Sequence, residues 1–523
     1  MTTFQAPDAS ELVAGCFEVD ESTDTVARTK AKQAPLCVVL MNTPSLTLKL
    51  HQYAPALALA AHFESPRRVP PGVLVYFEVG TGKTLAALHA ARTFIDIKGG
   101  SVYIITTLAN IETTWTRDWT RYRRALNEIS PGSSGRYTRA LSWGTKDMIF
   151  KTDLKKPYMI ILDEAHLLRN LASVSATRTL AICEDADYVM PLTATPIVRT
   201  VYNLNAMSGY MTGFVDVVRQ RDDGTFPGPI EVGQYFNGMV LFKAQETSTY
   251  PSVVESTVHV PLGNEYEVFI RHDQQKLAEL HERFKNYRVG KEQWNTTIAR
   301  ITSLGPEEVV PNPFHVSGRQ VCNSIDKLAG IWNAIVTDGT TRVVVFSNFR
   351  NEGIDGFMKW LVETQQFRRT GKREYEYVTR NEGGRKYEVV LWHNAHFDSI
   401  TTWQHKVDSI TKILLISPMA REGLSLKGVR TFHLMDPAWN CSDETQAIGR
   451  AVRMTSHTHL PPDEQQIRVC RWIATYKGGQ TADERLTELA RRNASIIAPF
   501  NRRLQLVGTN YLDRLTKNRL GVA

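Results

Sequence analysis

The feature that most constrains this chain of 523 residues is a glycine-rich turn between an apolar run and an amphipathic segment. Residues 73–77, Val-Leu-Val-Tyr-Phe, predict a buried strand, and residues 84–94 predict a helix. The turn, residues 78–83, reads Glu-Val-Gly-Thr-Gly-Lys. Glycines let successive backbone N–H groups turn inward around an anion, and a helix start adds partial positive charge. This order of elements therefore predicts a phosphate-binding loop in an α/β fold.

Each residue of the loop has a predicted task toward a bound nucleotide. The backbone of Gly80, Thr81 and Gly82 would wrap around the phosphates. Lys83 would reach the β- and γ-phosphates, and Thr84 would bind Mg²⁺. The loop therefore predicts ATP as the nucleotide and Mg²⁺ as the cofactor, with Lys83 among the catalytic residues.

A second apolar run ends in two adjacent carboxylates. Residues 159–162, Met-Ile-Ile-Leu, lead into Asp163 and Glu164. A strand that ends there presents both side chains at the carboxyl edge of its sheet, where ligands of open α/β sheets bind. We expect Asp163 to hold Mg²⁺, and Glu164 to orient and deprotonate the attacking water. His166, two residues further on, would couple this site to the next motif or merely pack.

Two further motifs supply hydroxyl and guanidinium groups. The sequence Leu-Thr-Ala-Thr-Pro ends another strand, and its Thr193 and Thr195 would relay the state of the nucleotide site. Residues 446–453 read Gln-Ala-Ile-Gly-Arg-Ala-Val-Arg, so Arg450 and Arg453 lie three apart and are expected on one helical face. Both could then point at phosphates across a domain cleft. Such an arginine contributes about 10³–10⁵ in rate.

Short β-rich runs that alternate with helices predict two doubly wound, parallel sheets. The expected strands of the first series are residues 73–77, 101–106, 158–162 and 188–192. Those of the second series are residues 342–346, 387–391, 412–416 and 431–435. The expected segments are an N-terminal segment 1–40, a first α/β domain 41–215, a helical bridge or insertion 216–324, a second α/β domain 325–480 and a basic helical tail 481–523. The tail would either lie over the second domain or grip a nucleic-acid duplex.

Composition limits the classes of partner. Hydrophobic residues make up 42% of the chain and charged residues 22%, which is typical of a globular enzyme. The formal net charge of +8 favours a polyanionic partner such as nucleic acid. The six cysteines include no CxxC pair, which argues against a disulfide framework and a structural zinc. No signal peptide and no apolar run of about 18 residues is present, so we expect a reducing compartment and no membrane partner.

In their order along the chain, these motifs resemble helicase superfamily 2. The resemblance implies two RecA-like domains, ATP hydrolysis and a nucleic-acid track. Gln52 is similar to the glutamine that reads adenine in this superfamily, and Gln446 lies in the nucleotide-binding motif that also holds the two arginines. Residues 106–108, followed by two tryptophans, resemble a motif that contacts nucleic-acid backbone, and residues 420–426 resemble another. The nucleic-acid contacts implied in this way are Thr106, Thr107, Gly423 and Ser425.

Two narrower resemblances refine this family. Residues 319–323 are similar to the bridge between the domains of Swi/Snf-type translocases, and residues 436–440 are similar to a later stretch of the same group. Residues 76–84 and 449–461 resemble the transcription ATPases of poxviruses and other large DNA viruses. These are the nucleoside triphosphate phosphohydrolase and the small subunit of the early transcription factor.

The resemblance implies a double-stranded DNA translocase that acts in viral transcription, at initiation or termination. Its partner would be a viral RNA polymerase or a transcription-factor subunit, in the virion or the host cytoplasm. One alternative is a strand-separating helicase on DNA or RNA. Another is a non-catalytic transcription-factor subunit, but the presence of every ATP-contacting residue type argues against it. The sequence does not indicate the oligomeric state.

Overall fold

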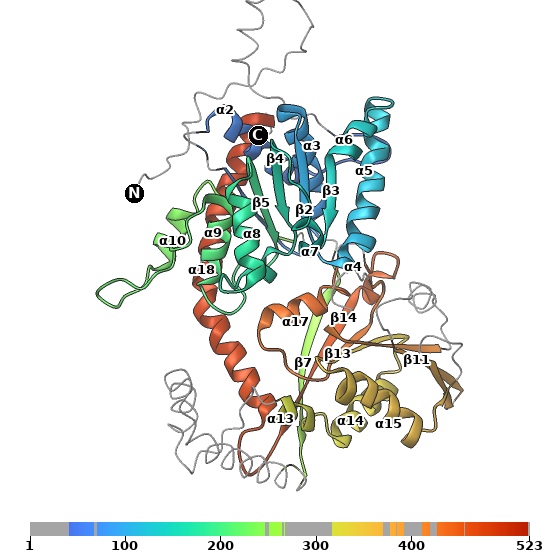
Figure 1. The fold of residues 1–523 in the computed structure, drawn as a ribbon. Coiled ribbons are helices and arrows are strands. Elements are labelled where there is room, and N and C mark those ends of the chain that lie inside the picture. Colours follow the sequence, from blue (N-terminus) through green and yellow to red (C-terminus); the bar gives the residue numbers. More distant parts are fainter. Residues whose placement is uncertain are drawn as a thin grey trace, which may run out of the picture. The chain divides into compact units, whose positions relative to one another are not determined.

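The computed structural model describes residues 41–66, 69, 71–245, 250–263, 266, 316–369, 377–382, 384–391, 410–418, 426–453 and 456–520. The chain forms two compact units (Figure 1). The first unit comprises the chain up to Glu246 together with residues 494–523, and the second comprises residues 247–493. Each unit contains one sheet with a hydrophobic core on either face. The predicted α/β class, with two largely parallel sheets, is therefore confirmed.

The sheet of the first unit is parallel throughout, in the order β3-β2-β4-β5-β1-β6. All residues of β1 and β4 are buried, as expected for strands that are covered on both faces. Because the strands are parallel, their carboxyl ends meet at one edge of the sheet. Its strands are β1 (Leu74–Phe77), β2 (Ser101–Ile105), β3 (Leu141–Gly144), β4 (Tyr158–Leu162), β5 (Tyr188–Thr193) and β6 (Val240–Lys243).

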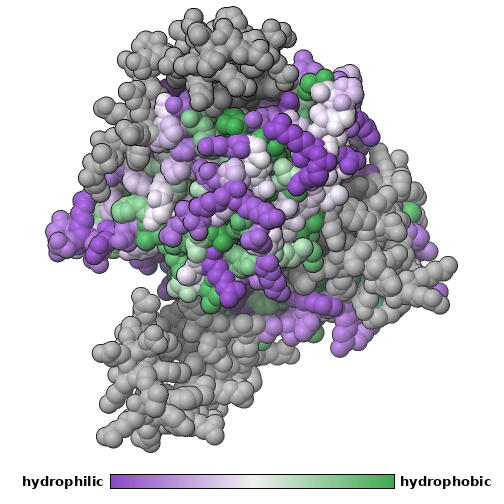
Figure 2. All heavy atoms as spheres, turned by 45° about the horizontal axis from the view of Figure 1, so that its top comes forward, coloured by the Kyte–Doolittle hydropathy of each residue, from purple (hydrophilic) through white to green (hydrophobic). Residues whose placement is uncertain are grey.

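Helices cover both faces of this sheet. Helices α2, α3 and α5 contribute to the core on one face, and α8 and α9 contribute to the core on the other. On the face that Figure 2 shows, hydrophilic and hydrophobic residues are interspersed. Within the described residues no helix is both long and apolar enough to span a bilayer. The helical segments are α2 (Leu50–Glu64), α3 (Lys83–Lys98), α4 (Leu108–Asn110), the π-helix η2 (Ile111–Trp115), α5 (Thr116–Ile129), α6 (Ser134–Ala140), α7 (Lys146–Ile149), η3 (Ala165–Leu168), α8 (Val174–Glu184), α9 (Asn203–Thr212) and α10 (Pro229–Tyr235).

The C-terminal helix α18 (Ala482–Leu520) packs on the edge strand β6. A Cβ atom on Gly508 would lie 2.8 Å from the Cβ of Phe242 and 2.9 Å from its backbone nitrogen, so glycine permits this close approach. Tyr511 is buried in the core on one face of the sheet, and Leu504 in the core on the other. The helix thus protects an edge that would otherwise be open to pairing with another strand.

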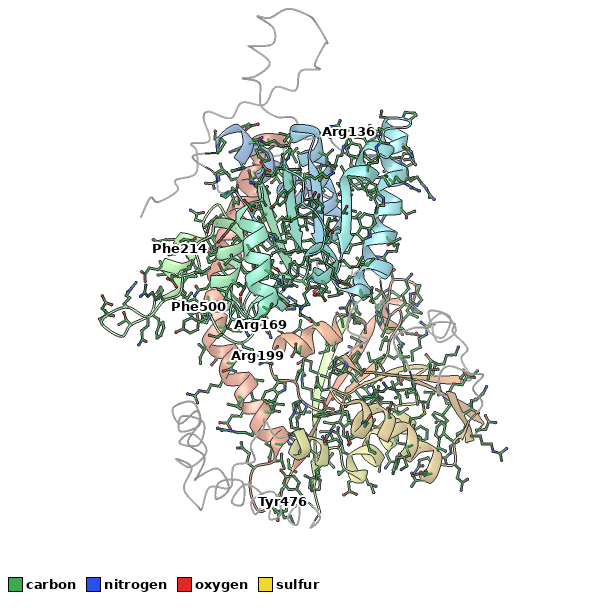
Figure 3. All side chains as sticks on the ribbon, viewed as in Figure 1. Arg136, Arg169, Arg199, Phe214, Tyr476 and Phe500 are labelled. Atoms are coloured by element: carbon green, nitrogen blue, oxygen red, sulfur yellow. The ribbon has the colours of Figure 1, made fainter. Side chains whose placement is uncertain are left out.

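This packing corrects the expectation that the basic tail lies over the second domain. Residues 494–520 of α18 belong to the first unit. Phe500 packs against the core that also contains α9 (Figure 3). Arg519 pairs with Glu64 at the end of α2. The apolar stripe of the tail predicts a packed helix, but a stripe does not identify the surface that it packs against.

The segment predicted as a helical bridge, residues 216–324, contains two strands. Strand β6 pairs in parallel with β1, so the first sheet extends beyond the expected boundary at residue 215. Strand β7 (Ser252–Pro261) pairs in parallel with β14 at the edge of the second sheet. β6 was missed because its three apolar residues, Val240, Leu241 and Phe242, are a weak strand signal. Residues 264, 265 and 267–315 of this segment lie outside the described residues.

The sheet of the second unit has the order β7-β14-β13-β8-β12-β11-β10-β9. It is parallel from β7 to β11, and β10 and β9 continue it in antiparallel fashion. Its strands, besides β7, are β8 (Arg342–Phe346), β9 (Arg368–Arg369), β10 (Tyr377–Glu382), β11 (Arg385–Leu391), β12 (Ile410–Ile416), β13 (Thr431–Leu434) and β14 (Gln466–Thr475). Its helical segments, besides α18, are α13 (Val316–Val321), α14 (Ile325–Asp338), η5 (Arg350–Asp355), α15 (Gly356–Thr364), α17 (Cys441–Ile448) and η7 (Pro462–Glu464).

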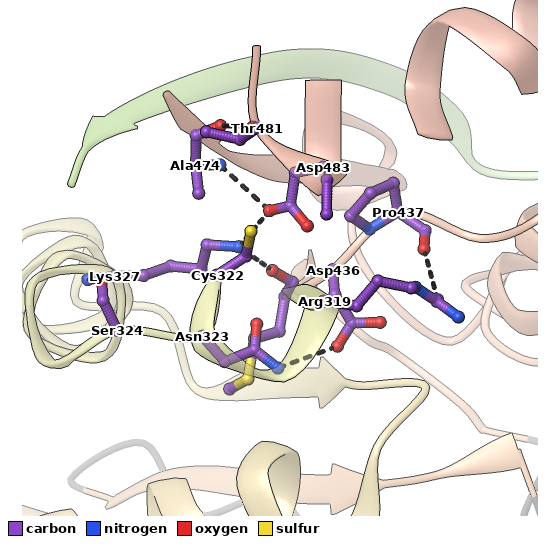
Figure 4. A network of polar contacts seen from close by, with 12 residues as sticks. Arg319, Cys322, Asn323, Ser324, Lys327, Asp436, Pro437, Ala474, Thr481 and Asp483 are labelled. Atoms are coloured by element: carbon purple, nitrogen blue, oxygen red, sulfur yellow. Dashed lines mark hydrogen bonds and ion pairs between the residues drawn. The ribbon is translucent and has the colours of Figure 1, made fainter. Parts of the chain in front are cut away.

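A buried ion pair lies at the centre of the second unit (Figure 4). The Nζ atom of Lys327 lies 2.6 Å from Oδ2 of Asp483, and the two side chains are 0% and 1% exposed. Lys327 also donates to the carbonyl oxygen of Met435, and the backbone N–H of Ala474 donates to the same oxygen of Asp483. The pair therefore joins the start of α14 to the start of α18.

The two stretches that resemble Swi/Snf-type proteins meet beside this ion pair. Arg319 lies between the rings of Phe349 and Trp439, at 4.8 and 4.9 Å from their centroids. Asn323 donates a hydrogen bond to the carboxylate of Asp436 (Figure 4). The stacked guanidinium and the amide thus fix the loop that leads from β13 to α17.

Candidate nucleotide-binding site

The predicted phosphate loop connects β1 to α3. Gly80 and Gly82 have φ angles of 83° and 85°, in the left-handed region that favours glycine. Lys83 is the first residue of α3, and its Nζ atom donates to the carbonyl oxygens of Phe77 at 2.8 Å and Glu78 at 3.4 Å. The lysine thus closes over a loop that lies at a helix start, which is the local structure that binds phosphate.

Gln52 lies against this loop from α2. Its Nε2 atom lies 3.4 Å from the carbonyl oxygen of Thr81 and 3.3 Å from that of Gly82. Its Oε1 atom accepts from the backbone N–H of Lys49 at 2.8 Å. The neighbouring His51, which we did not single out from the sequence, also contacts the Thr81 carbonyl oxygen through Nε2, at 2.9 Å. The structure brings Gln52 to the loop, and its reading of adenine stays a prediction.

The two carboxylates follow β4 at the same sheet edge. Oδ2 of Asp163 accepts hydrogen bonds from Thr106 Oγ1 at 2.6 Å, Trp115 Nε1 at 2.9 Å and Asn110 Nδ2 at 3.2 Å. Burial, and next the charge of Glu164, raise the pKa of Asp163, while the first two of these bonds lower it. The Asp163 carboxylate is therefore held by neutral donors.

Glu164 has a left-handed backbone, with φ and ψ both at 48°. This conformation costs a non-glycine residue about 1–2 kcal/mol and is most often retained at functional sites. Its side chain is 25% exposed, and Oε2 lies 3.4 Å from Nδ1 of His166. The turn thus presents a partly exposed carboxylate beside Asp163, and its role as the water-activating base stays a prediction.

The predicted coupling residues also come together. Nδ1 of the buried His166 lies 3.0 Å from Oγ1 of Thr193 at the end of β5. The same oxygen accepts from the backbone N–H of Thr195 at 3.0 Å. Arg169, which we did not single out (Figure 3), donates to the carbonyl oxygen of His166 at 2.8 Å. These contacts link the ends of β4 and β5, while the coupling role itself stays a prediction.

Thr106 and Thr107 differ in their surroundings. Thr106 is buried and its hydroxyl donates to Asp163, so its nucleic-acid contact stays a prediction. It follows β2 directly, and the pleat turns it toward the neighbouring strand end. Thr107 is half-buried and caps α4 by accepting from the N–H of Asn110 at 3.4 Å. Its nucleic-acid contact stays a prediction, and Gly423 and Ser425 lie outside the described residues.

The second unit carries Gln446 on α17, with the two arginines after the helix. Helix α17 ends at Ile448, so the prediction that Arg450 and Arg453 share one helical face is wrong. Shorter turns follow, in which Arg450 N–H donates to the carbonyl oxygen of Ala447 at 3.2 Å. Nε of Arg453 donates to the carbonyl oxygen of Gly449 at 2.9 Å. Their approach to the phosphate loop stays a prediction.

The donor set of the first unit fits a Mg²⁺ nucleotide. Carboxylate and hydroxyl oxygens are ligands that Mg²⁺ accepts together with phosphate oxygens and water. Asp163 is an acceptor with three neutral donors on one oxygen. Thr84 follows Lys83 at the start of α3. The residues that would hold Mg²⁺ are therefore Asp163 and Thr84, and those that would hold the phosphates are Gly80, Thr81, Gly82 and Lys83.

Comparisons with known proteins find similarity to helicases and to viral ATPases. Residues 326–455 match a family model described as the helicase conserved C-terminal domain. A protein of Acanthamoeba polyphaga mimivirus, provisionally named an ATP-dependent RNA helicase, is 26% identical over 477 residues, which cover 87% of this chain and 96% of that protein. A termination factor NPH-I homologue of African swine fever virus is 40% identical over 65 residues, which cover 12% of this chain and 9% of that protein. The SWI2/SNF2 ATPase core of Sulfolobus solfataricus in complex with dsDNA matches 91% of this chain and 99% of that chain at 14% identity, but its TM-score of 0.30 is too low to carry an argument.

Proposed function

We propose that this chain, an ATP hydrolase related to the superfamily 2 helicases and to viral transcription ATPases, is a double-stranded DNA translocase that acts in viral transcription, at initiation or termination. The relationship that the motifs predicted is confirmed. One observation carries the proposal: a single sheet edge gathers the phosphate loop, the Asp163–Glu164 pair and the His166–Thr193 contact.

Residues of the first unit have separate roles in the proposed hydrolysis of ATP. Lys83 binds phosphate oxygens in place of the two carbonyl oxygens that it contacts here. Glu164 orients water and takes its proton, while His166 holds the Glu164 carboxylate from 3.4 Å and links it to Thr193. When bound, Mg²⁺ neutralises charge on the phosphate oxygens, and Asp163 would hold it.

The second unit supplies the remaining groups of the proposed site. Arg450 and Arg453 stabilise the charge that develops on the phosphates, and Gln446 contacts the nucleotide. Their action requires the two units to close on the bound nucleotide, so hydrolysis and domain movement are coupled. Loss of Arg453 should therefore lower turnover while it leaves ATP affinity largely intact.

The proposed track is the phosphate backbone of duplex DNA. The net charge of +8 and the pI of about 9.0 suit a polyanion. Thr107, Gly423 and Ser425 would contact the backbone without reading bases. The African swine fever virus relative is named a termination factor, which favours a viral RNA polymerase or transcription-factor subunit as partner, in the virion or the host cytoplasm.

Steady-state ATP turnover with duplex DNA, single-stranded DNA and RNA in parallel tests the proposal. We expect the largest stimulation from duplex DNA, with affinity that falls steeply with salt. Glu164→Gln should lower turnover by about 10²-fold or more and retain nucleotide binding. Glu184→Gln, on the exposed face of α8, is the matched control and should leave turnover unchanged. Equal turnover in the wild type and Glu164→Gln would refute the assigned base.

A strand-separating helicase is the second candidate, because the mimivirus relative is named an RNA helicase. Displacement of a third strand from a DNA triplex reports translocation without unwinding, whereas release of a labelled strand from a duplex reports unwinding. Triplex displacement alone supports the translocase. ATP-dependent release of a strand from RNA or DNA duplexes would favour the helicase instead.

A further inference from the structure

Three donors from one ten-residue segment converge on a single carboxylate oxygen. Thr106 follows β2, Asn110 ends α4 and Trp115 ends η2, and all three hydrogen bonds reach Oδ2 of Asp163. The side chains are buried, with Trp115 at 0% exposure. An indole N–H at this depth needs an acceptor, and here the acceptor lies 48 residues away in sequence.

The backbone of this segment departs from α-helical geometry in the turn that ends at Trp115. Residues 111–115 form a π-helix between α4 and α5. A π-helical turn is rare, is less favourable than an α-helical one and occurs often at functional sites. The wider turn brings Trp115, the last residue of η2, into hydrogen-bond distance of Asp163.

We infer that Trp115 and Asn110 are positioning residues that hold the metal-site carboxylate of Asp163, so that its Oδ1 atom faces the Mg²⁺ of the nucleotide. The inference rests on the proposed function, because that function makes Asp163 a metal ligand. The donors on Oδ2 are neutral, so the negative charge of Asp163 stays available to the cation. Groups that orient a metal ligand in this way contribute about 10- to 100-fold to metal affinity or activity.

Trp119 provides a matched control. It lies four residues further along, on α5, and is likewise buried. Its ring stacks on Tyr122 and meets Trp143 edge-on. Replacement of either tryptophan by Phe removes similar volume, but only Trp115→Phe removes a donor from the Asp163 carboxylate.

Binding of Mn²⁺ to the full chain with ADP, followed by electron paramagnetic resonance, tests the inference without any need for hydrolysis. We expect Trp115→Phe to raise the Mn²⁺ dissociation constant about 10-fold or more, Asn110→Ala to raise it less, and Asp163→Asn to abolish binding. Trp119→Phe should leave it unchanged, and all four variants should bind ADP without metal as the wild type does. Asn110→Ala also serves as the test if Trp115→Phe does not fold.

The outcomes separate this inference from the proposed function. Unchanged Mn²⁺ affinity in a folded Trp115→Phe, or an equal loss in Trp119→Phe, would overturn the positioning role. Unchanged Mn²⁺ affinity in Asp163→Asn would also overturn it, because Asp163 would not be a ligand. Weakened Mn²⁺ binding in Trp115→Phe, together with a wild type that no nucleic acid stimulates, would uphold the positioning role and reject the translocase.

Discussion

The two units hold an aspartate carboxylate in opposite ways. Asp163 of the first unit is partly exposed and accepts only from neutral hydroxyl, amide and indole groups. Asp483 of the second unit is 1% exposed and pairs with the ammonium group of Lys327 at 2.6 Å. Burial is the largest cause that raises the pKa of each carboxyl. The next cause differs: the charge of Glu164 raises the pKa of Asp163 further, whereas the charge of Lys327 lowers that of Asp483.

This difference separates a closed structural pair from the proposed Mg²⁺ site. Lys327 supplies both a counter-charge and a hydrogen bond to the Asp483 carboxylate, so this carboxylate needs no further cation. Asp163 and Glu164 repel each other, and the charge of Lys83 lowers the pKa of Asp163 less than the hydrogen bonds from Thr106 and Trp115 do. A divalent cation would relieve that repulsion. Two carboxylates whose pKa is raised by burial can thus be told apart by whether the fold supplies their counter-charge.

Lys327→Met is expected to break the closed pair with the largest effect on stability. It leaves the Asp483 carboxylate buried and unpaired, which costs about 3–5 kcal/mol. Lys327→Met with Asp483→Asn should recover much of that loss, because no unpaired charge remains. Lys359→Met, in an exposed pair with Glu363 whose side chains are 70% and 61% exposed, should change stability by less than about 0.5 kcal/mol. Urea unfolding monitored by circular dichroism measures all three, and an equal loss in Lys327→Met and Lys359→Met would contradict the contrast.

Asp163→Asn is the reciprocal test on the first unit. The amide oxygen still accepts from Thr106 and Trp115, and a raised pKa means that the site already disfavours the charge. The free energy of unfolding should therefore stay within about 1 kcal/mol of the wild type. ATP turnover should fall by about 10²-fold or more, since a group that stabilises transition-state charge is lost. A loss of stability as large as that of Lys327→Met would show that Asp163 is structural as well.

The buried histidines sharpen the comparison, because here the two units behave alike. Burial lowers the pKa of His89 in the first unit to about 3 and that of His433 in the second to about 4. Nδ1 of His433 accepts from Trp472, so the neutral ring is the bonded form. Near pH 6.5 each histidine binds a proton in the unfolded chain but not in the folded chain. The contribution of the neutral histidine to stability is therefore fully present above that pH, and it is lost as the pH drops toward 4.

Between pH 6.5 and 5, each histidine should cost roughly 2 kcal/mol of stability. His89→Asn keeps a polar atom for the hydroxyl of Tyr122, which lies 2.8 Å from Nδ1, but removes the titration. Urea unfolding at several pH values should therefore show a shallower acid slope in His89→Asn and in His433→Asn than in the wild type. An unchanged slope in both variants would mean that other groups govern the acid sensitivity.

Contiguous motifs were the part of the site that sequence could predict. The strand before the phosphate loop, the left-handed glycines and the Asp163–Glu164 pair depend on neighbours in sequence, so local pattern suffices. The partner of Trp115 depends on which strand ends lie side by side. Hydrogen bonds that span 48 and 57 residues leave no local trace, and for that reason Thr106 was assigned to nucleic acid rather than to Asp163.

The same limit applies to the fold. Strand 342–346 was predicted with the bounds that β8 has, because its last four residues form a continuous apolar run. Strand β6 was missed, and the tail, which was expected either to lie over the second domain or to grip a duplex, packs in the first unit from residue 494 on. Both differences concern the edge of the first sheet, where the short strand β6 and the distant helix α18 pack against each other. The sequence pattern of neither the strand nor the helix identifies the element that it packs against.

Because α18 completes the first unit, the order of synthesis matters for this protein. A ribosome that has made the chain up to Glu246 has supplied six strands, but not Leu504 or Tyr511. About 250 further residues must be added first, which takes roughly 12–50 s at about 5–20 residues per second. During that interval the edge of β6 is open on the nascent chain, in reach of chaperones and of other unpaired strands. Of the two units, the one whose strands are translated earlier is thus the one that is completed later.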